Sequence, residues 1–248
     1  MSYTSGDAFQ ANLATLLSSL PAAAAASSGF AENNTGITPA QAYGLAQCRA
    51  DVGMSSCRAC LNHTAREIAS ACPGRRNAML VYEGCLLRYS NASFFGAPDT
   101  GDPIYQVSDV QNNVRQAPEQ FASRLSELMD NLTMKAAYGS RRMFAVGAVN
   151  HAPFVTIYGM ARCTEDTAPD DCNSCLEIVT KTIPKCCSGK EGGRVFARSC
   201  SVRFELYRFY NEEAAEAAMA PASSPATGGE LVNGSDHSGP RITVSVSI

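Results

Sequence analysis

The sequence predicts an α+β protein made of two tandem copies of one small, disulfide-rich domain, each with two helices packed on an antiparallel sheet. Three observations lead to this prediction. The chain has 11 cysteines in 248 residues, the cysteine pattern recurs after a fixed interval, and helix-like and strand-like segments follow one another in the same order in both halves. With 45% hydrophobic residues, the chain can build a core in each of two domains.

The cysteine pattern is the main sign of an internal repeat. Five cysteines of the first half recur in the second half at a constant offset of 115 residues, and the spacing C-x8-C-x2-C is present in both copies. YGLAQC at the start of the first set is echoed by YGMARC in the second. Such a fixed register indicates two copies of one structural unit. The two sets are Cys48, Cys57, Cys60, Cys72 and Cys85, and Cys163, Cys172, Cys175, Cys187 and Cys200.

Each copy begins with an amphipathic segment, Phe9–Leu20 or Phe121–Leu132, whose apolar residues recur at helical spacing. We expect these helices to face the core rather than a partner, because a small domain needs its apolar stripes inside. A second helix per copy is predicted from the C-x2-C motif onward, over residues 60–72 and 175–186. The segment Pro21–Ser28 is expected to be a flexible loop, since Asn and Gly residues follow it closely.

Strands are predicted where β-branched and aromatic residues partly alternate around the last cysteine of each set. These segments are residues 78–90 and 193–209, and residues 143–149 and 153–160 add strand candidates in the second copy. The resulting domain boundaries are 1–97 for the first domain, 98–116 for a linker, 117–210 for the second domain and 211–248 for a tail. The tail is expected to be disordered, because Ala, Ser, Pro and Gly offer little to bury.

Cysteine density indicates an oxidising compartment, in which disulfides persist. Five Asn-x-Ser/Thr sequons agree with this and are candidate glycosylation sites: Asn33, Asn62, Asn91, Asn131 and Asn233. The chain as given begins with no basic, apolar leader and has no apolar run long enough to span a bilayer, so we expect neither a signal peptide nor a membrane helix in it. A net charge of −3 disfavours nucleic acid as a partner.

With these motifs in view, the chain resembles the ginkbilobin-like, or stress-antifungal, domain of plants. The resemblance covers Tyr3 to Tyr210 and is carried by the doubled C-x8-C-x2-C motif, with GCLLRYSN following the first motif and CCSGKEGGRV and SCSVRFELYRFY following the second. Two such copies followed by a tail of small residues are typical of the ectodomains of cysteine-rich receptor-like kinases and of cysteine-rich repeat secretory proteins.

The resemblance implies four disulfides: Cys48 to Cys57, Cys60 to Cys85, Cys163 to Cys172, and Cys175 to Cys200. A third family bridge joins the position of Cys72 to a cysteine near the domain's N-terminus, which would lie upstream of Met1. Cys72 therefore has no assigned partner, and we expect the sequence to begin inside the first domain. Cys186 and Cys187 are also unassigned, and we favour a structural role for them over a redox sensor.

Antifungal members of the family bind mannose through an Asn near the domain start, an Arg six residues before the last cysteine and a Glu five residues after it. The resemblance places Arg194 and Glu205 at the last two positions of the second copy. A guanidinium can donate to sugar hydroxyls and a carboxylate can accept from them. The alternative is a cross-strand ion pair. The first copy has Met79 and Ser90 instead, and the Asn is matched in neither copy.

Other chemistry is disfavoured. The C-x2-C motifs suit zinc or thiol redox chemistry in isolation, but each belongs to a repeated set of five cysteines. The histidines are not repeated between the copies, and His151 is expected in a loop. SGKEGGR precedes a strand rather than a helix, which does not suit a phosphate loop. We therefore expect neither catalysis, metal nor cofactor in this chain.

The resemblance implies a non-catalytic recognition module, acting in the apoplast or at the outer face of the plasma membrane, as the ectodomain of a cysteine-rich receptor-like kinase in stress or defence signalling. The alternative is a secreted, mannose-binding antifungal protein. Expected partners are plasma-membrane receptor proteins in the first case and cell-wall or fungal carbohydrate in the second.

Overall fold

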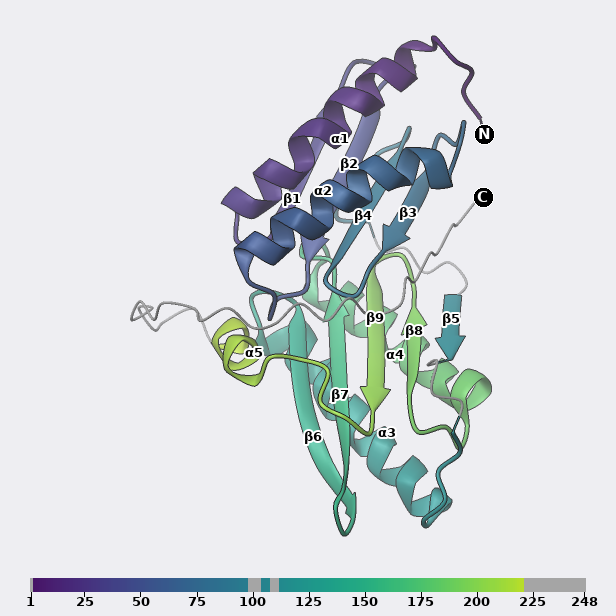
Figure 1. Ribbon diagram of the computed structural model, residues 1–248, viewed down its shortest axis with the longest axis vertical. Helices are drawn as coiled ribbons and strands as arrows, with labels where there is room; N and C mark the ends of the chain where they lie inside the picture. Colours follow the sequence, from purple (N-terminus) through teal and green to yellow (C-terminus); the bar gives the residue numbers. More distant parts are fainter. Residues whose placement is uncertain (1, 98–103, 108–111, 221–248) are drawn as a thin grey trace. The chain divides into compact units, whose positions relative to one another are not determined.

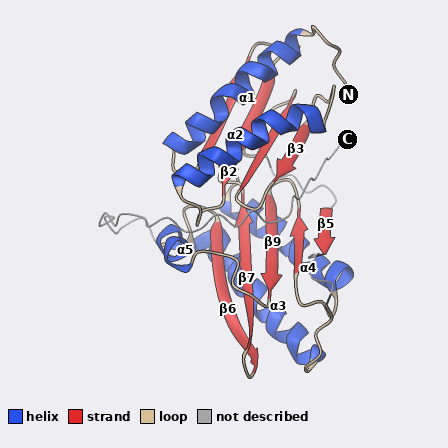
Figure 2. Cartoon of the chain, in the orientation of Figure 1, coloured by secondary structure: helices blue, strands red, loops and turns tan. Residues whose placement is uncertain are grey.

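A computed structural model describes residues 2–97, 104–107 and 112–220. These residues form two compact units, one within residues 2–95 and the other within residues 96–220. The predicted α+β class is confirmed, because in each unit helices cover one face of an antiparallel sheet (Figures 1 and 2). The repeat seen in the cysteines is therefore a repeat of the fold.

In the first unit, the chain forms a helix, two strands, a second helix and two further strands. Among the described residues, its sheet has four antiparallel strands in the order β1-β2-β4-β3. Both helices lie on the same face of this sheet (Figure 1). The elements are α1 (Ala8–Ala26), β1 (Phe30–Thr35), β2 (Ala42–Cys48), α2 (Met54–Ala71), β3 (Ala78–Val81) and β4 (Cys85–Ser90).

Helix α1 differs from its prediction, because it continues through the segment expected to be a loop. Pro21 lies inside the helix, and the five residues that follow it, 22–26, are all alanine, the strongest helix former. Pro21 and Ala24 are buried, so this part extends the core-facing side of the helix. The helix ends where Ser28 and Gly29 adopt positive φ angles of 57° and 96°.

The second unit repeats this plan with an additional strand at one edge. Its sheet, over the described residues, has five antiparallel strands in the order β5-β8-β9-β7-β6. His151, expected in a loop, lies in β6. The elements are β5 (Ile104–Val107), α3 (Pro118–Met134), the π-helix η1 (Lys135–Gly139), β6 (Phe144–Ala152), β7 (Val155–Cys163), α4 (Pro169–Cys187), β8 (Gly193–Phe196), β9 (Cys200–Glu205) and α5 (Glu212–Met219).

Two segments outside the expected domains contain regular structure. Residues 104–107, expected to belong to a linker, form β5 and pair with β8. Residues 212–219, expected to be disordered, form α5, whose N-cap Asn211 accepts a hydrogen bond from the amide of Ala214. Ala215 is fully buried, so the small residues of this segment do pack. The rest of the tail, including the sequon at Asn233, lies outside the described residues.

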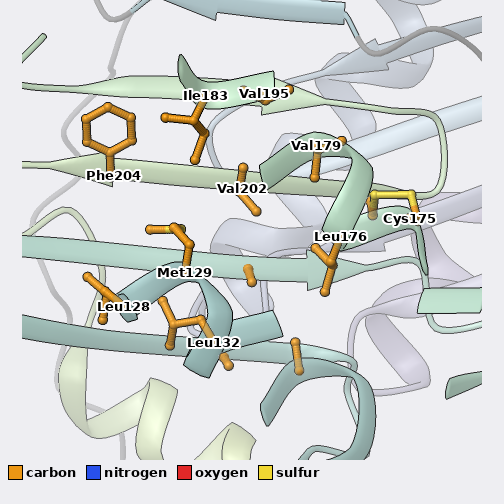
Figure 3. Packing of buried hydrophobic residues seen from close by; sticks show 14 of the residues in the cluster. Leu128, Met129, Leu132, Cys175, Leu176, Val179, Ile183, Val195, Val202 and Phe204 are labelled. Carbon is orange, nitrogen blue, oxygen red and sulfur yellow. A yellow bond between two sulfur atoms is a disulfide. The ribbon is translucent and has the colours of Figure 1, made fainter. Parts of the chain in front are cut away.

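Each unit has its own hydrophobic core between helices and sheet. In the second unit, Leu128, Met129 and Leu132 of α3 and Val179 of α4 belong to this core together with Val202 on β9 (Figure 3). A Cβ on Gly159 of β7 would lie 2.6 Å from Met129 and 2.8 Å from Leu132.

Gly44 in β2 is the counterpart of Gly159. A Cβ there would lie 2.7 Å from Leu20 and 2.9 Å from Leu16 of α1. The glycines of the YGLAQC and YGMARC motifs therefore let the first helix of each unit approach its sheet closely.

Candidate functional site

The four bridges implied by the resemblance are present in the structure. Each unit has one bridge that spans 9 residues and one that spans 25. In both units they join the second helix to two adjacent strands. The bridges are Cys48–Cys57 and Cys60–Cys85 on α2, and Cys163–Cys172 and Cys175–Cys200 on α4.

The register of the strands explains this arrangement. Cys48 lies opposite Cys85 across β2 and β4, and both bond to cysteines in the first two turns of α2. Cys163 lies opposite Cys200 in the same way across β7 and β9. The two bridges of a unit therefore fix the N-terminal part of its second helix to the same end of two central strands.

The cysteines left unassigned by the sequence are also located. Cys186 and Cys187 are bonded to each other at the end of α4. Cys72 is a buried thiol directly after α2. Beside it, Tyr89 donates a hydrogen bond to the carbonyl of Arg75, and burial raises the pKa of the Tyr89 hydroxyl.

Arg194 and Glu205 lie on the same face of the second sheet, together with a residue that the sequence did not suggest. Arg203 is directly opposite Arg194 across β8 and β9, and Glu205 follows it by two residues on the same side of β9. The Nε of Arg203 donates to Oε1 of Glu205 at 3.0 Å, whereas the Nε of Arg194 lies 3.9 Å from that oxygen. The side chain of Glu205 is only 1% exposed, so two guanidinium groups surround a buried carboxylate.

A loop and a second chain segment border this cluster. The carboxylate of Glu205 lies against Gly192, where a Cβ would be 1.9 Å from Oε2. Immediately before this glycine, the amide of Glu191 donates to the carbonyl of Asn112 at 3.1 Å, and Nζ of Lys190 donates to Oδ1 of Asn113 at 3.0 Å. The structure therefore brings two asparagines, from the segment expected to be a linker, beside the loop that contacts Glu205.

Comparison of the two units separates the parts of this cluster that are repeated from those that are not. The guanidinium of Arg88 lies over the ring of Phe94 at 4.1 Å, and that of Arg203 lies over the ring of Phe209 at 4.0 Å. Both residues of the second pair are offset from the first by 115 positions. The arginine over an aromatic ring therefore belongs to the repeated fold, whereas Arg194 and Glu205 occur in the second unit alone.

The described sequons occupy two kinds of structure. Asn33 lies in β1 and Asn91 directly after β4, whereas Asn62 and Asn131 lie inside α2 and α3. Among the residues that the structure describes, no group of three or more His, Cys, Asp or Glu side chains is placed to hold a metal ion. Within the same ranges, none of the helices has the length and apolar character needed to cross a membrane.

Paired helix-to-strand disulfides on a repeated helix-and-sheet frame define a tandem, cysteine-rich α+β protein. The chain belongs to the salt stress response/antifungal family, whose model matches residues 1–92 and 107–207. The resemblance found in the sequence is thereby confirmed.

Three similar plant proteins are of different kinds. An antimicrobial ginkbilobin-2-like protein of Castanea crenata is 38% identical over 84% of both chains. Cysteine-rich repeat secretory protein 38 of Arabidopsis thaliana is 37% identical over 84% of this chain and 81% of its own. Cysteine-rich receptor-like protein kinase 25 of the same plant is 37% identical over 90% of this chain, which spans 33% of the kinase.

Solved structures show the same fold. The tandem DUF26 ectodomain of the Arabidopsis thaliana cysteine-rich receptor-like protein PDLP8 matches with a TM-score of 0.72 and 26% identity, over 84% of this chain and 95% of the ectodomain. That of PDLP5 matches with a TM-score of 0.69 and 23% identity, over 84% and 95%. This chain is thus a module related to receptor ectodomains and to secretory proteins of the family.

Proposed function

We propose that the chain is a non-catalytic recognition module that acts outside the cell, as the ectodomain of a cysteine-rich receptor-like kinase in stress or defence signalling. The observation that carries this proposal is the match of both units together to a tandem receptor ectodomain, over 95% of its length. The 37% identity with a receptor-like kinase over 90% of this chain supports it. Its partners are receptor proteins of the plasma membrane.

The cystine frame suits such a role. Bridges that hold a helix on two central strands make each unit a rigid scaffold, and rigid scaffolds present their recognition residues on loops and exposed positions. Phe154 is a candidate contact residue, because it lies fully exposed in the turn between β6 and β7 with a positive φ of 63°. Large exposed aromatic side chains are enriched in protein interfaces.

The test is a binding screen of the oxidised protein against plant receptor ectodomains, with Phe154→Ser beside the wild type. We expect saturable binding to at least one ectodomain and weaker binding by the variant. Ile37→Ser is the matched control, because Ile37 is also highly exposed but belongs to the other unit. A blank screen with correctly bridged protein contradicts the receptor proposal, whereas equal binding by wild type and F154S contradicts the assignment of Phe154.

A second candidate function is mannose binding by the second unit of a secreted antifungal protein. It is supported by the cluster of Arg194 and Glu205, by the position of Asn112 and Asn113 beside it, and by the name and similarity of the Castanea crenata relative. The burial of Glu205 and its bond to Arg203 count against it, because a sugar would have to compete with that guanidinium. For this reason we place it second.

A glycan array that includes mannose tests this candidate. Mannose binding that is lost in both Arg194→Ala and Arg194→Lys is expected from a site that uses the planar fork of the guanidinium, because lysine keeps the charge but not the fork. Arg124→Ala is the matched control, because Arg124 is a half-exposed arginine on α3 that pairs with Glu127. Mannose binding that survives R194A excludes this site.

A further inference from the structure

In the folded chain, a glycosyltransferase cannot reach the whole sequon at Asn62, because the third residue of the sequon is buried. Asn62 is exposed on α2, but Thr64 is fully buried. The Thr64 hydroxyl donates to the carbonyl of Cys60 at 2.8 Å and lies 3.2 Å from Sγ of Cys85. Both cysteines belong to the bridge between α2 and β4, so the hydroxyl is enclosed by that bridge and by the helix.

The position of Thr64 is a core position in both units. The residue 115 positions later is Val179, which is fully buried in the second core. The copy of the fold that has no sequon here therefore places an apolar side chain of the same shape at this point. Burial of Thr64 follows from the fold and leaves no room for another molecule to reach its hydroxyl.

A transferase that recognises Asn-x-Thr has to contact the amide and the hydroxyl together. Residues two apart in a helix do not face the same way, so α2 separates Asn62 from Thr64. Residues two apart in a strand do face the same way. Asn33 and Thr35 meet this condition, because they lie in the edge strand β1, where Asn33 is exposed and Thr35 half-buried.

We propose that Asn62 accepts an N-linked glycan only before α2 has formed and the Cys60–Cys85 bridge has closed, whereas Asn33 remains an acceptor on the folded domain. Since Asn62 itself is exposed, a glycan attached early fits the folded surface, and timing decides occupancy. Asn131 also lies in a helix, α3, and is followed two residues later by the buried Thr133, whose hydroxyl has no hydrogen-bond partner among the described residues. The inference rests on the proposed extracellular role, which takes the chain through the secretory pathway.

Two reactions compete for the segment. In the first, Nδ2 of Asn62 forms a bond to C1 of the first sugar of a lipid-linked diphosphate oligosaccharide, the bond from C1 to the diphosphate oxygen breaks, and an amide proton passes to a base of the transferase. In the second, the thiols of Cys60 and Cys85 give two electrons and two protons to the disulfide of an oxidoreductase, which becomes a dithiol. Once the Cys60–Cys85 bridge and α2 have formed, glycan transfer to Asn62 stops.

The experiment measures glycan occupancy at each sequon after expression of the full chain in plant cells behind a secretion leader. Enzymatic deglycosylation in H2¹⁸O followed by peptide mass spectrometry is applied to total cellular protein, so that variants that fold poorly are included. We expect low occupancy at Asn62 in the wild type and a several-fold rise in the double variant C60S/C85S. The matched control is C175A/C200A, which removes the equivalent bridge of the second unit and, unlike serine at position 175, creates no Asn-x-Ser sequon at Asn173.

Asn33 is the internal standard and is expected to be occupied in every variant. Thr64→Val removes the sequon while keeping the shape of the core residue, so the signal at Asn62 in this variant defines zero occupancy. A brief pulse of dithiothreitol during synthesis of the wild type makes the same test without mutation and is expected to raise occupancy at Asn62.

Three outcomes overturn the inference: Asn62 as fully occupied as Asn33 in the oxidised wild type, an occupancy at Asn62 that neither C60S/C85S nor the reductant changes, or an unoccupied Asn33. Failure to bind receptor ectodomains or mannose changes none of these occupancies. The inference and the proposed function are therefore tested separately.

Discussion

At the scale of single residues, the repeat distinguishes side chains that build the fold from those that one unit has added. Arg203 and its aromatic partner have counterparts in the first unit, but Glu205 corresponds to Ser90. The second unit has therefore placed a carboxylate beside an arginine that the fold already holds. Because this carboxylate is buried, its negative charge has to be compensated by that arginine.

We expect Arg203→Ala to lower the free energy of unfolding by about 3–5 kcal/mol, since removal of one partner of a buried ion pair leaves an uncompensated charge. Arg194→Ala should cost clearly less, because its Nε lies 3.9 Å from Glu205 rather than 3.0 Å. Urea unfolding of each variant, followed by circular dichroism, measures the difference. Equal losses for the two variants would contradict this account of the cluster.

The double variant R203A/E205A provides the control. Removal of the carboxylate together with Arg203 leaves neither of these two charges without the other, so the loss of stability in the double variant should be smaller than the sum of the two single losses. Contacting residues in one ion-pair network typically show coupling of this kind.

Only part of the candidate site could be predicted from single residues. Arg194 and Glu205 were found through their distances from a cysteine, which are fixed along the chain. Arg203 was not, because its importance depends on the register that sets it opposite Arg194. Asn112 and Asn113 were not matched either, since they come near Gly192 through bonds between segments about 80 residues apart along the chain.

At the scale of elements, the close approach of the first helix to the sheet is the feature most sensitive to a small change. We expect Gly159→Ala to lower the free energy of unfolding by about 1–3 kcal/mol, because overpacking of a filled core forces side chains and backbone to shift. The new methyl group would overlap Met129 and Leu132 of α3. Urea unfolding is again the measurement, and Gly44→Ala should behave alike against α1.

Gly139→Ala is the matched control. This glycine ends the π-helix, and a Cβ on it would have nothing within 4 Å. Its substitution should leave the midpoint of unfolding almost unchanged. A loss as large as that of G159A would show that glycine itself, rather than space beneath the helix, matters at these positions.

Elements were predictable where periodicity is long and local. The apolar spacing of Phe121–Leu132 identified α3, and the strands around Cys85 and Cys200 were identified by alternation. Strand β5 has four residues and is stabilised by pairing with a distant strand, so nothing local marks it. The end of α1 was missed because Pro21 and the asparagines beyond it outweighed a run of alanines in the prediction.

At the scale of the whole molecule, the same pair of bridges occurs in both units, with sequence separations of 9 and 25 residues. A bridge that closes a longer loop restricts the unfolded chain more. The repeat therefore supplies two independent measurements of one effect in a single protein.

We expect loss of the long bridge through C60S/C85S to cost about 1 kcal/mol more than loss of the short one through C48S/C57S, from the loop-length dependence of chain entropy. The same order should hold for C175S/C200S against C163S/C172S. Denaturant unfolding of the four double variants measures both differences. Agreement between the units is the control, and a reversed order in both would show that contacts of the folded state, not loop length, set the contribution of each bridge.

The tandem α+β fold was predictable from the sequence because five cysteines keep one offset across two copies, which no local pattern could imitate. The pairing of those cysteines came from the resemblance alone. The spacing along the chain cannot decide between alternative pairings. Cys48 and Cys85 lie opposite each other on neighbouring strands, and Cys57 and Cys60 are one helical turn apart.

That placement also has a consequence for how the chain oxidises. Cysteines directly opposite each other on adjacent strands are near enough to join, and so are two cysteines one helical turn apart. Bridges between Cys48 and Cys85 and between Cys57 and Cys60 would satisfy all four sulfurs and leave α2 untethered. The second unit offers the same wrong pairing, so we expect a thiol catalyst that reshuffles mispaired cystines to raise the yield of correctly bridged protein on oxidative refolding.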